Sequence, residues 1–146
     1  MIYQKILKGL AGVNELNKSV QQLLNPEHKE KNELNFGLTL FRENDRVMQI
    51  KNNYQMKWTD INTLKKGEGV FNGDMGIIKK IDKEKQTLEI VFDEEKRVTY
   101  QKDQIDELTL SYAITVHKSQ GSEFKAVIIP IFGGHSGFLN RNLLYT

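Results

Sequence analysis

Residues 115–123 gather side chains that could bind an anionic ligand. The segment reads Thr-Val-His-Lys-Ser-Gln-Gly-Ser-Glu and holds hydroxyl, imidazole, ammonium, amide and carboxylate groups. Amides around Lys118 and Ser119 at the start of a helical turn would favour a phosphate, and Gly121 permits close approach of a ligand. The alternative is a polar turn between two strands with only a structural role.

Apolar runs on both sides must position this segment. Residues 112–116 read Tyr-Ala-Ile-Thr-Val, which is typical of a strand buried in a sheet, and residues 126–131 predict a second strand. We therefore expect residues 115–123 to form a functional loop between two strands.

The N-terminal part predicts one amphipathic helix. Asn25-Pro26 predicts its end, because proline disfavours the helical conformation of the residue before it. Residues 28–35 are charged and favour a solvated loop or a frayed helix, whereas residues 38–41 and 46–50 predict a short strand pair or one bent strand. The apolar residues at helical spacing are Val13, Leu16, Val20, Leu23 and Leu24.

Short strands and tight turns follow from about residue 69. Leu88, Ile90 and Phe92 fall on one face of a predicted strand, and a series of short strands within about 40 residues suits a small β-barrel. The predicted strands cover residues 70–71, 76–78, 87–92 and 97–100, with turns at 72–74, 82–86 and 93–96 between them. The pattern returns to α/β at Leu110.

Composition sets broad limits. The chain has 146 residues, 38% of them hydrophobic and 27% charged, which is typical of one globular unit. Its formal net charge of +2 does not by itself indicate nucleic-acid binding. Cysteine is absent, which excludes disulfides, thiol nucleophiles and cysteine-based zinc sites. No apolar run approaches the roughly 20 residues that cross a bilayer, so we expect a cytoplasmic protein without membrane contact.

Other polar positions have alternative interpretations. Asn52, Asn53 and Tyr54 could meet phosphate or base, or Tyr54 could pack in the core. Residues 42–66 carry six Lys/Arg against three acids, which suits a phosphate-facing surface or an ordinary solvated face.

Three further residues favour structural interpretations. Asp74 fits a turn better than a metal site, because no second carboxylate lies at a useful spacing. Trp58 is expected to be a packing residue or a loop anchor. His135 lies in a glycine-rich segment that predicts a surface loop.

Four segments together resemble a known family. Residues 115–124 closely resemble helicase motif V of superfamily 1, in the form seen in RecD-like helicases of the exodeoxyribonuclease V alpha-subunit type. Residues 9–17 with 23–26 are similar to the start of that family's second RecA-like domain. Residues 45–54 and 70–76 resemble the segment that precedes motif V in that family. Residues 139–146 are similar to the segment that leads into motif VI.

The resemblance implies an α/β fold. Residues 1–66 and 109–146 would form the second RecA-like domain, of the P-loop NTPase type and truncated before motif VI is complete. Residues 67–108 would form an inserted SH3-like β-barrel. We therefore expect a C-terminal fragment of an ATP-dependent 5′-3′ DNA helicase, with a role in DNA repair and recombination.

The resemblance also implies ligand contacts within the family motif. The ATP side would be formed by Gln120, Gly121 and Glu123, with the Glu123 carboxylate accepting hydrogen bonds from ribose hydroxyls. The expected single-stranded DNA contacts are Thr115, His117, Lys118, Ser119, Asn53 and Tyr54.

A phosphate loop of the Gly-x-x-x-x-Gly-Lys-Ser/Thr type is absent from the sequence. We therefore expect no catalytic residue and no metal ligand here, and no ATPase activity from the fragment. ATP and Mg²⁺ would bind the complete enzyme, with the N-terminal RecA-like domain of the same parent chain as a partner and other recombination or repair subunits as further partners. The alternative function is a non-catalytic nucleic-acid or protein-binding module docking through its barrel. Residues 79–107 hold seven basic and nine acidic side chains, which favours protein contact.

Overall fold

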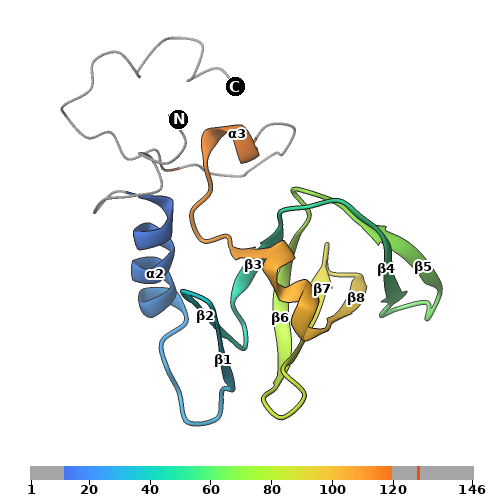
Figure 1. Ribbon diagram of the computed structural model, residues 1–146, viewed down its shortest axis with the longest axis horizontal. Coiled ribbons are helices and arrows are strands. Elements are labelled where there is room, and N and C mark those ends of the chain that lie inside the picture. The colour runs from blue at the N-terminus through green and yellow to red at the C-terminus, as the bar shows by residue number, and fades with distance from the viewer. Residues whose placement is uncertain (1–11, 120–127, 129–146) are drawn as a thin grey trace.

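The computed structural model describes residues 12–119 and Ile128, and it is mostly β-structure (Figure 1). Helix α2 (Val13–Leu24) lies beside a two-stranded hairpin, and a larger curled sheet lies on the other side of that hairpin. Apart from Ile128, the predicted strand at residues 126–131 lies outside the described residues, as does the loop around His135. The strands are β1 (Glu33–Phe36), β2 (Thr39–Arg42), β3 (Arg46–Gln49), β4 (Asn53–Asp60), β5 (Lys66–Val70), β6 (Met75–Asp82), β7 (Thr87–Phe92), β8 (Lys96–Tyr100) and β9 (Leu108–Leu110).

Seven of these strands form one antiparallel sheet in the order β5-β4-β8-β7-β6-β3-β9. Two register shifts, between Asn53 and Lys57 in β4 and between Ile78 and Lys80 in β6, mark irregularities of the kind that bend strands. The resulting curled half-barrel fits the predicted SH3-like barrel. A RecA-like α/β domain is not evident in the described residues. The predicted barrel limits, residues 67–108, stay a prediction, and the sheet also includes β3 and β4 from before residue 67.

Local turn chemistry explains the central hairpins. The Asp82 carboxylate accepts hydrogen bonds from the amides of Glu84 and Lys85 and so fixes the β6–β7 turn. Asp93 and Glu94 have φ values of 50° and 61°, the left-handed conformation that tight β-hairpin turns require. The predicted strand at 87–92 is confirmed as β7, and those at 76–78 and 97–100 lie within the longer β6 and β8, whereas only Val70 of the strand predicted at 70–71 lies in β5.

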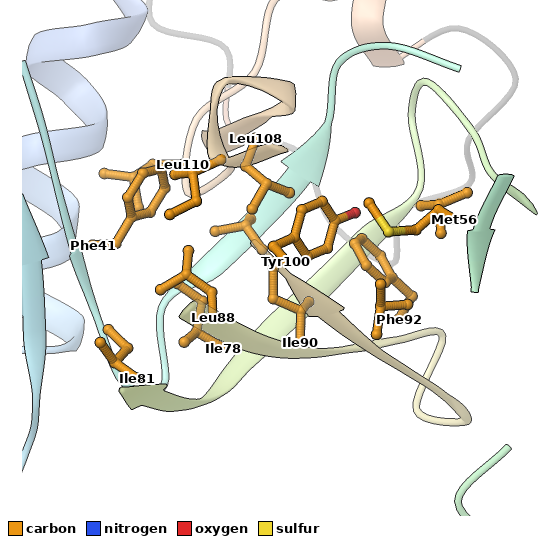
Figure 2. Close-up of a cluster of buried hydrophobic side chains, with 14 residues drawn as sticks. Phe41, Met56, Ile78, Ile81, Leu88, Ile90, Phe92, Tyr100, Leu108 and Leu110 are labelled. Carbon is orange, nitrogen blue, oxygen red and sulfur yellow. The ribbon is translucent and has the colours of Figure 1, made fainter. Parts of the chain in front are cut away.

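The core lies inside the curl of the sheet. Figure 2 shows side chains from β6, β7, β8 and β9 pointing into one interior. Leu88, Ile90 and Phe92 are all fully buried, as their shared face predicts. Tyr100 is also fully buried, and its hydroxyl donates to Gln49 Oε1 at 2.8 Å, which satisfies its polar end.

A strand that the sequence did not predict lies before the large sheet. Residues 33–36 form β1 and pair with β2, where a loop or frayed helix was expected. Gly37, at φ +59°, enables the tight turn between them. The predicted pairing of residues 38–41 with 46–50 is therefore wrong, because β2 pairs with β1 and β3 pairs with β6 and β9.

Helix α2 is confirmed, and it ends at Leu24 just before Asn25-Pro26. The most deeply buried side chains of this helix are polar, not apolar. Leu23 and Leu24 are 78% and 66% exposed, whereas Asn17 and Gln21 are buried. The helix therefore docks through polar side chains.

The predicted strand at residues 112–116 is wrong. Strand β9 ends at Leu110, residues 112–115 are irregular, and residues 116–119 form the short helix α3 (Val116–Ser119). The backbone of Ala113 is hydrogen-bonded to the Asn17 side chain rather than to a neighbouring strand. A 3-10 helix, η1 (Lys102–Glu107), connects β8 to β9.

Candidate nucleic-acid interface

We define residues 115–119 as the ligand turn. Residues 112–115 are irregular, and residues 116–119 form the single helical turn α3. The Lys118 amide donates to the Thr115 carbonyl at 2.9 Å. The His117 side chain is exposed, and partial burial lowers the pKa of Lys118 from its ordinary value of 10.5. The Thr115 hydroxyl is buried and has no hydrogen-bond partner in the described part of the chain. Ser119 belongs to α3, whereas Gln120, Gly121 and Glu123 lie outside the described residues.

Two contacts hold the chain immediately before this turn. The Asn17 side chain donates to the Ala113 carbonyl and accepts from the Ala113 amide, both at 2.9 Å. One residue earlier, the Tyr112 hydroxyl donates to Asp45 Oδ1 at 2.8 Å. Side chains nearly 100 and 70 residues away in sequence therefore fix the approach to the ligand turn.

The Asp45 carboxylate is the centre of a buried polar network. Asp45 is fully buried and accepts from Gln21 Nε2 at 2.6 Å and from Asn25 Nδ2 at 2.7 Å. The Arg42 amide donates to the same carboxylate at 2.7 Å. Together with the Tyr112 hydroxyl, four donors surround this carboxylate, as burial of a charged group demands.

Internal pairing reduces the local positive charge of residues 42–66. Arg42 is buried, and its guanidinium donates to Glu33 and to the Asn25 carbonyl. Lys51 forms an exposed ion pair with Asp106. Two of the six cations are thus engaged with protein groups, which leaves a weaker positive face than their count indicates.

Asn53 and Tyr54 are the first two residues of β4. Figure 1 shows α3 beyond one end of the curled sheet and the β4–β5 hairpin at its side. The Asn53 amide donates to both Glu107 carboxylate oxygens, at 3.1 and 3.2 Å. Tyr54 is 69% exposed and meets Phe71 edge to face at 5.6 Å, so the interpretation of Tyr54 as a core residue is wrong.

The structure gives the other polar candidates structural contacts. Asp74 accepts the Phe71 amide at 2.8 Å, beside a positive φ of 104° at Gly73, as expected of a turn. The Trp58 ring covers Gly67 and packs against the core. In the described residues, no cluster of His, Cys, Asp or Glu could hold a metal ion. None of the helices in the described ranges is long and apolar enough to span a membrane.

Sequence reasoning missed the residues that hold the ligand turn in place. Asn17, Gln21 and Asn25 recur every four positions, which puts them on one side of a helix. This spacing of amides occurs in the same segment as the apolar residues at helical spacing that predict α2. A polar stripe of amides would have pointed to a buried polar partner such as Asp45.

The Tyr112 hydroxyl makes one link of this network sensitive to pH. Burial, together with the hydrogen bond to Asp45 and the charge of that carboxylate, raises the pKa of Tyr112 to about 12 from 10.0. Because the folded pKa lies above the unfolded one, the resulting stabilisation is complete below pH 10 and is lost as pH rises from 10 to 12.

We expect Tyr112→Phe to lower the free energy of unfolding at pH 8 by about 0.5–1.5 kcal/mol, because one buried hydrogen bond is lost. The variant should then lose less stability than the wild type between pH 10 and 12. Urea denaturation of both proteins across this range measures the difference. Parallel stability curves above pH 10 would contradict the assigned environment of Tyr112.

Comparison with known proteins places these features in a family. A family model described as the SH3 domain of ATP-dependent RecD-like DNA helicases matches residues 16–92. A second model, described as a UvrD-like helicase C-terminal domain, matches residues 110–146 and so includes the ligand turn. No solved structure matches the chain at a significant level.

Two curated relatives are similar over most of the chain. The ATP-dependent RecD2 DNA helicase of Deinococcus radiodurans is 32% identical over 139 residues, or 95% of this chain. An uncharacterized protein of Methanocaldococcus jannaschii is 41% identical over 112 residues, or 70% of this chain. The chain covers only 17% and 9% of the lengths of these two relatives.

Proposed function

Because this chain belongs to the family of ATP-dependent RecD-like DNA helicase SH3 domains, we propose that it contributes single-stranded DNA contacts and part of the ATP site to a 5′-3′ DNA helicase. It comprises the SH3-domain region and the start of a UvrD-like C-terminal domain. The observation that carries the proposal is the ligand turn, a short helical turn with an exposed imidazole and a lysine next to it.

Phosphate is the ligand that suits this turn best. The Lys118 ammonium has lost part of its hydration through partial burial, and a phosphate would supply the missing counter-charge. The exposed His117 side chain can donate a hydrogen bond to a second phosphate oxygen. The Thr115 hydroxyl, buried without a partner among the described residues, would gain one if the turn adjusts around a bound strand. These contacts go to the backbone and carry no base sequence.

The second half of the motif is proposed to face ATP. Gln120, Gly121 and Glu123 directly follow the ligand turn, so one segment would contact DNA with its first half and the nucleotide with its second. Residues 1–66 and 109–146 are proposed to belong to a RecA-like domain, with the barrel at 67–108 inserted in it. The N-terminal RecA-like domain of the parent chain would supply the phosphate loop and the Mg²⁺ site, because no Gly-x-x-x-x-Gly-Lys-Ser/Thr segment occurs in this sequence.

The role of this chain in the helicase cycle is then to hold the strand. ATP hydrolysis between two RecA-like domains supplies the motion, and this chain's residues bind and release the phosphate backbone in step with it. The proposed partners are therefore single-stranded DNA, ATP and the N-terminal RecA-like domain, within a repair or recombination helicase.

We expect weak, salt-sensitive binding of oligo-dT by the 146-residue chain. Two or three phosphate contacts give a slope of log affinity against log salt of about −1.4 to −2.1 for a single strand. Titrating labelled oligo-dT at several salt concentrations measures that slope. Salt-independent binding, or tighter binding of a duplex of equal length, would contradict the proposal.

One observation favours a second candidate function, a protein-binding module. The exposed Tyr54 and Phe71 rings lie together at one end of the β4–β5 hairpin, and residues 79–107 carry a net charge of −2. An apolar pair on a mildly acidic domain suits a protein surface better than a DNA groove. A Tyr54→Ala variant that binds oligo-dT like the wild type is expected under this alternative, whereas base stacking on Tyr54 would make the variant weaker.

A further inference from the structure

Helix α2 presents a stripe of buried amides to the rest of the protein. Asn17, Gln21 and Asn25 are 3%, 4% and 4% exposed and follow one another at intervals of four residues. Gln21 donates to the Leu40 carbonyl at 2.9 Å as well as to Asp45, and Asn25 donates to the Glu43 carbonyl at 3.0 Å. Burying three amides is costly unless all are paired, so this face is specific for one docked position.

The Asn17 contact fixes both backbone groups of a single residue. The Asn17 side chain accepts a hydrogen bond from the Ala113 amide and donates one to the Ala113 carbonyl, two residues before Thr115. Two hydrogen bonds to the backbone of one residue set its orientation as well as its location. No strand pairing holds this segment in the described structure, because β9 ends at Leu110.

Asp45 connects the same segment to the large sheet. Its carboxylate accepts the Tyr112 hydroxyl, and its carbonyl accepts the Ile78 amide of β6 at 3.0 Å. The residue also opens β3, which begins at Arg46. The approach to the ligand turn, helix α2 and the curled sheet therefore meet at this one residue.

We propose that Asn17 and Asp45 are positioning residues, which orient residues 112–113 so that the ligand turn presents His117 and Lys118 to the phosphates of single-stranded DNA. This inference rests on the proposed function. Neither residue touches the ligand, since both are buried and act through Tyr112 and Ala113. Through them, the placement of the DNA contact depends on helix α2 and on the sheet together.

Asn17→Ala tests the inference with a matched control in the same helix. Asn14 is exposed three residues earlier, so Asn14→Ala removes the same amide without touching Ala113. Hydrogen exchange of the amides from Ala113 to Lys118, measured well below the melting temperature, should be about five- to a hundredfold faster in Asn17→Ala, because its two hydrogen bonds are gone. Exchange in β6 and β7 should not change.

Oligo-dT affinity of the same proteins gives the second readout. We expect Asn17→Ala to weaken binding and Asn14→Ala to leave it unchanged. Faster exchange spread evenly over β6 and β7, or equal affinities for the two variants, would overturn the positioning role. Should Asn17→Ala fail to fold, Tyr112→Phe removes only the second anchor and is expected to act in the same direction on both readouts. A wild-type chain that does not bind oligo-dT overturns the proposed function instead, and the exchange result still decides whether Asn17 orders the segment.

Discussion

Asp45→Ala is expected to lower the free energy of unfolding by about 2–6 kcal/mol, because it leaves two donors without an acceptor at about 1–3 kcal/mol each. The Arg42 amide and the Tyr112 hydroxyl lose the acceptor recorded for them. Gln21 and Asn25 each keep a second acceptor, the carbonyls of Leu40 and Glu43, so the total is smaller than four separate losses. With typical stabilities of about 5–15 kcal/mol, such a loss populates unfolded protein measurably.

Urea denaturation monitored by circular dichroism measures this effect. Asp103→Ala is the matched control, because Asp103 is exposed and its removal should change stability by no more than about 0.5 kcal/mol. Equal stability losses in the two variants would show that the Asp45 network does not hold the fold together. A loss confined to the Asp45 variant supports the network as the joint between helix α2 and the sheet.

The hairpins of the large sheet were predictable because their signals are local. Alternation of Leu88, Ile90 and Phe92 marks the buried face of β7, and the acidic turns on either side limit the strand. Asp82 and Asp93 act within a few residues of their own positions. Where a strand and its partner are adjacent in sequence, alternation and turn chemistry suffice.

The rest depended on partners that are distant in sequence. The sequence predicts a loop or a frayed helix at residues 28–35, because β1 has only four residues and its pairing with β2 competes with the predicted pairing of residues 38–41 with 46–50. The apolar, β-branched character of residues 112–116 predicts a strand, but the backbone of Ala113 is held by the Asn17 side chain instead. Residue types give a segment a preference for strand structure, but the groups that its backbone contacts in the fold decide whether a strand forms.

The short helical turn of the candidate site was predictable from the sequence, whereas the residues that support it were not. The ligand turn does form a short helical turn, as its sequence suggested. Asn53 and Tyr54 were grouped with it because both suit DNA, yet the structure has Asn53 paired with Glu107 at the start of β4. The four-residue spacing of Asn17, Gln21 and Asn25 indicates a buried polar partner, but the sequence does not identify the groups that they contact.

His117→Ala and Glu123→Ala are expected to separate the two halves of the motif. Loss of one hydrogen bond from His117 to DNA should weaken oligo-dT binding by about five- to a hundredfold, corresponding to about 1–3 kcal/mol. In the complete helicase, Glu123→Ala should instead weaken binding of an ATP analogue by a similar factor, because a ribose contact is lost. Neither change should lower the melting temperature of the domain, because the His117 side chain is exposed and Glu123 is proposed to face the nucleotide.

The DNA contact of the ligand turn is tested by measuring oligo-dT affinity for the wild type, His117→Ala and Glu123→Ala at one low salt concentration. We predict weaker binding for His117→Ala alone, with equal melting temperatures for all three proteins. A purely structural turn would lower the melting temperature of both variants together and change neither affinity selectively. Equal affinities in all three proteins, or equal losses in both variants, would contradict the assignment of the ligand turn to single-stranded DNA.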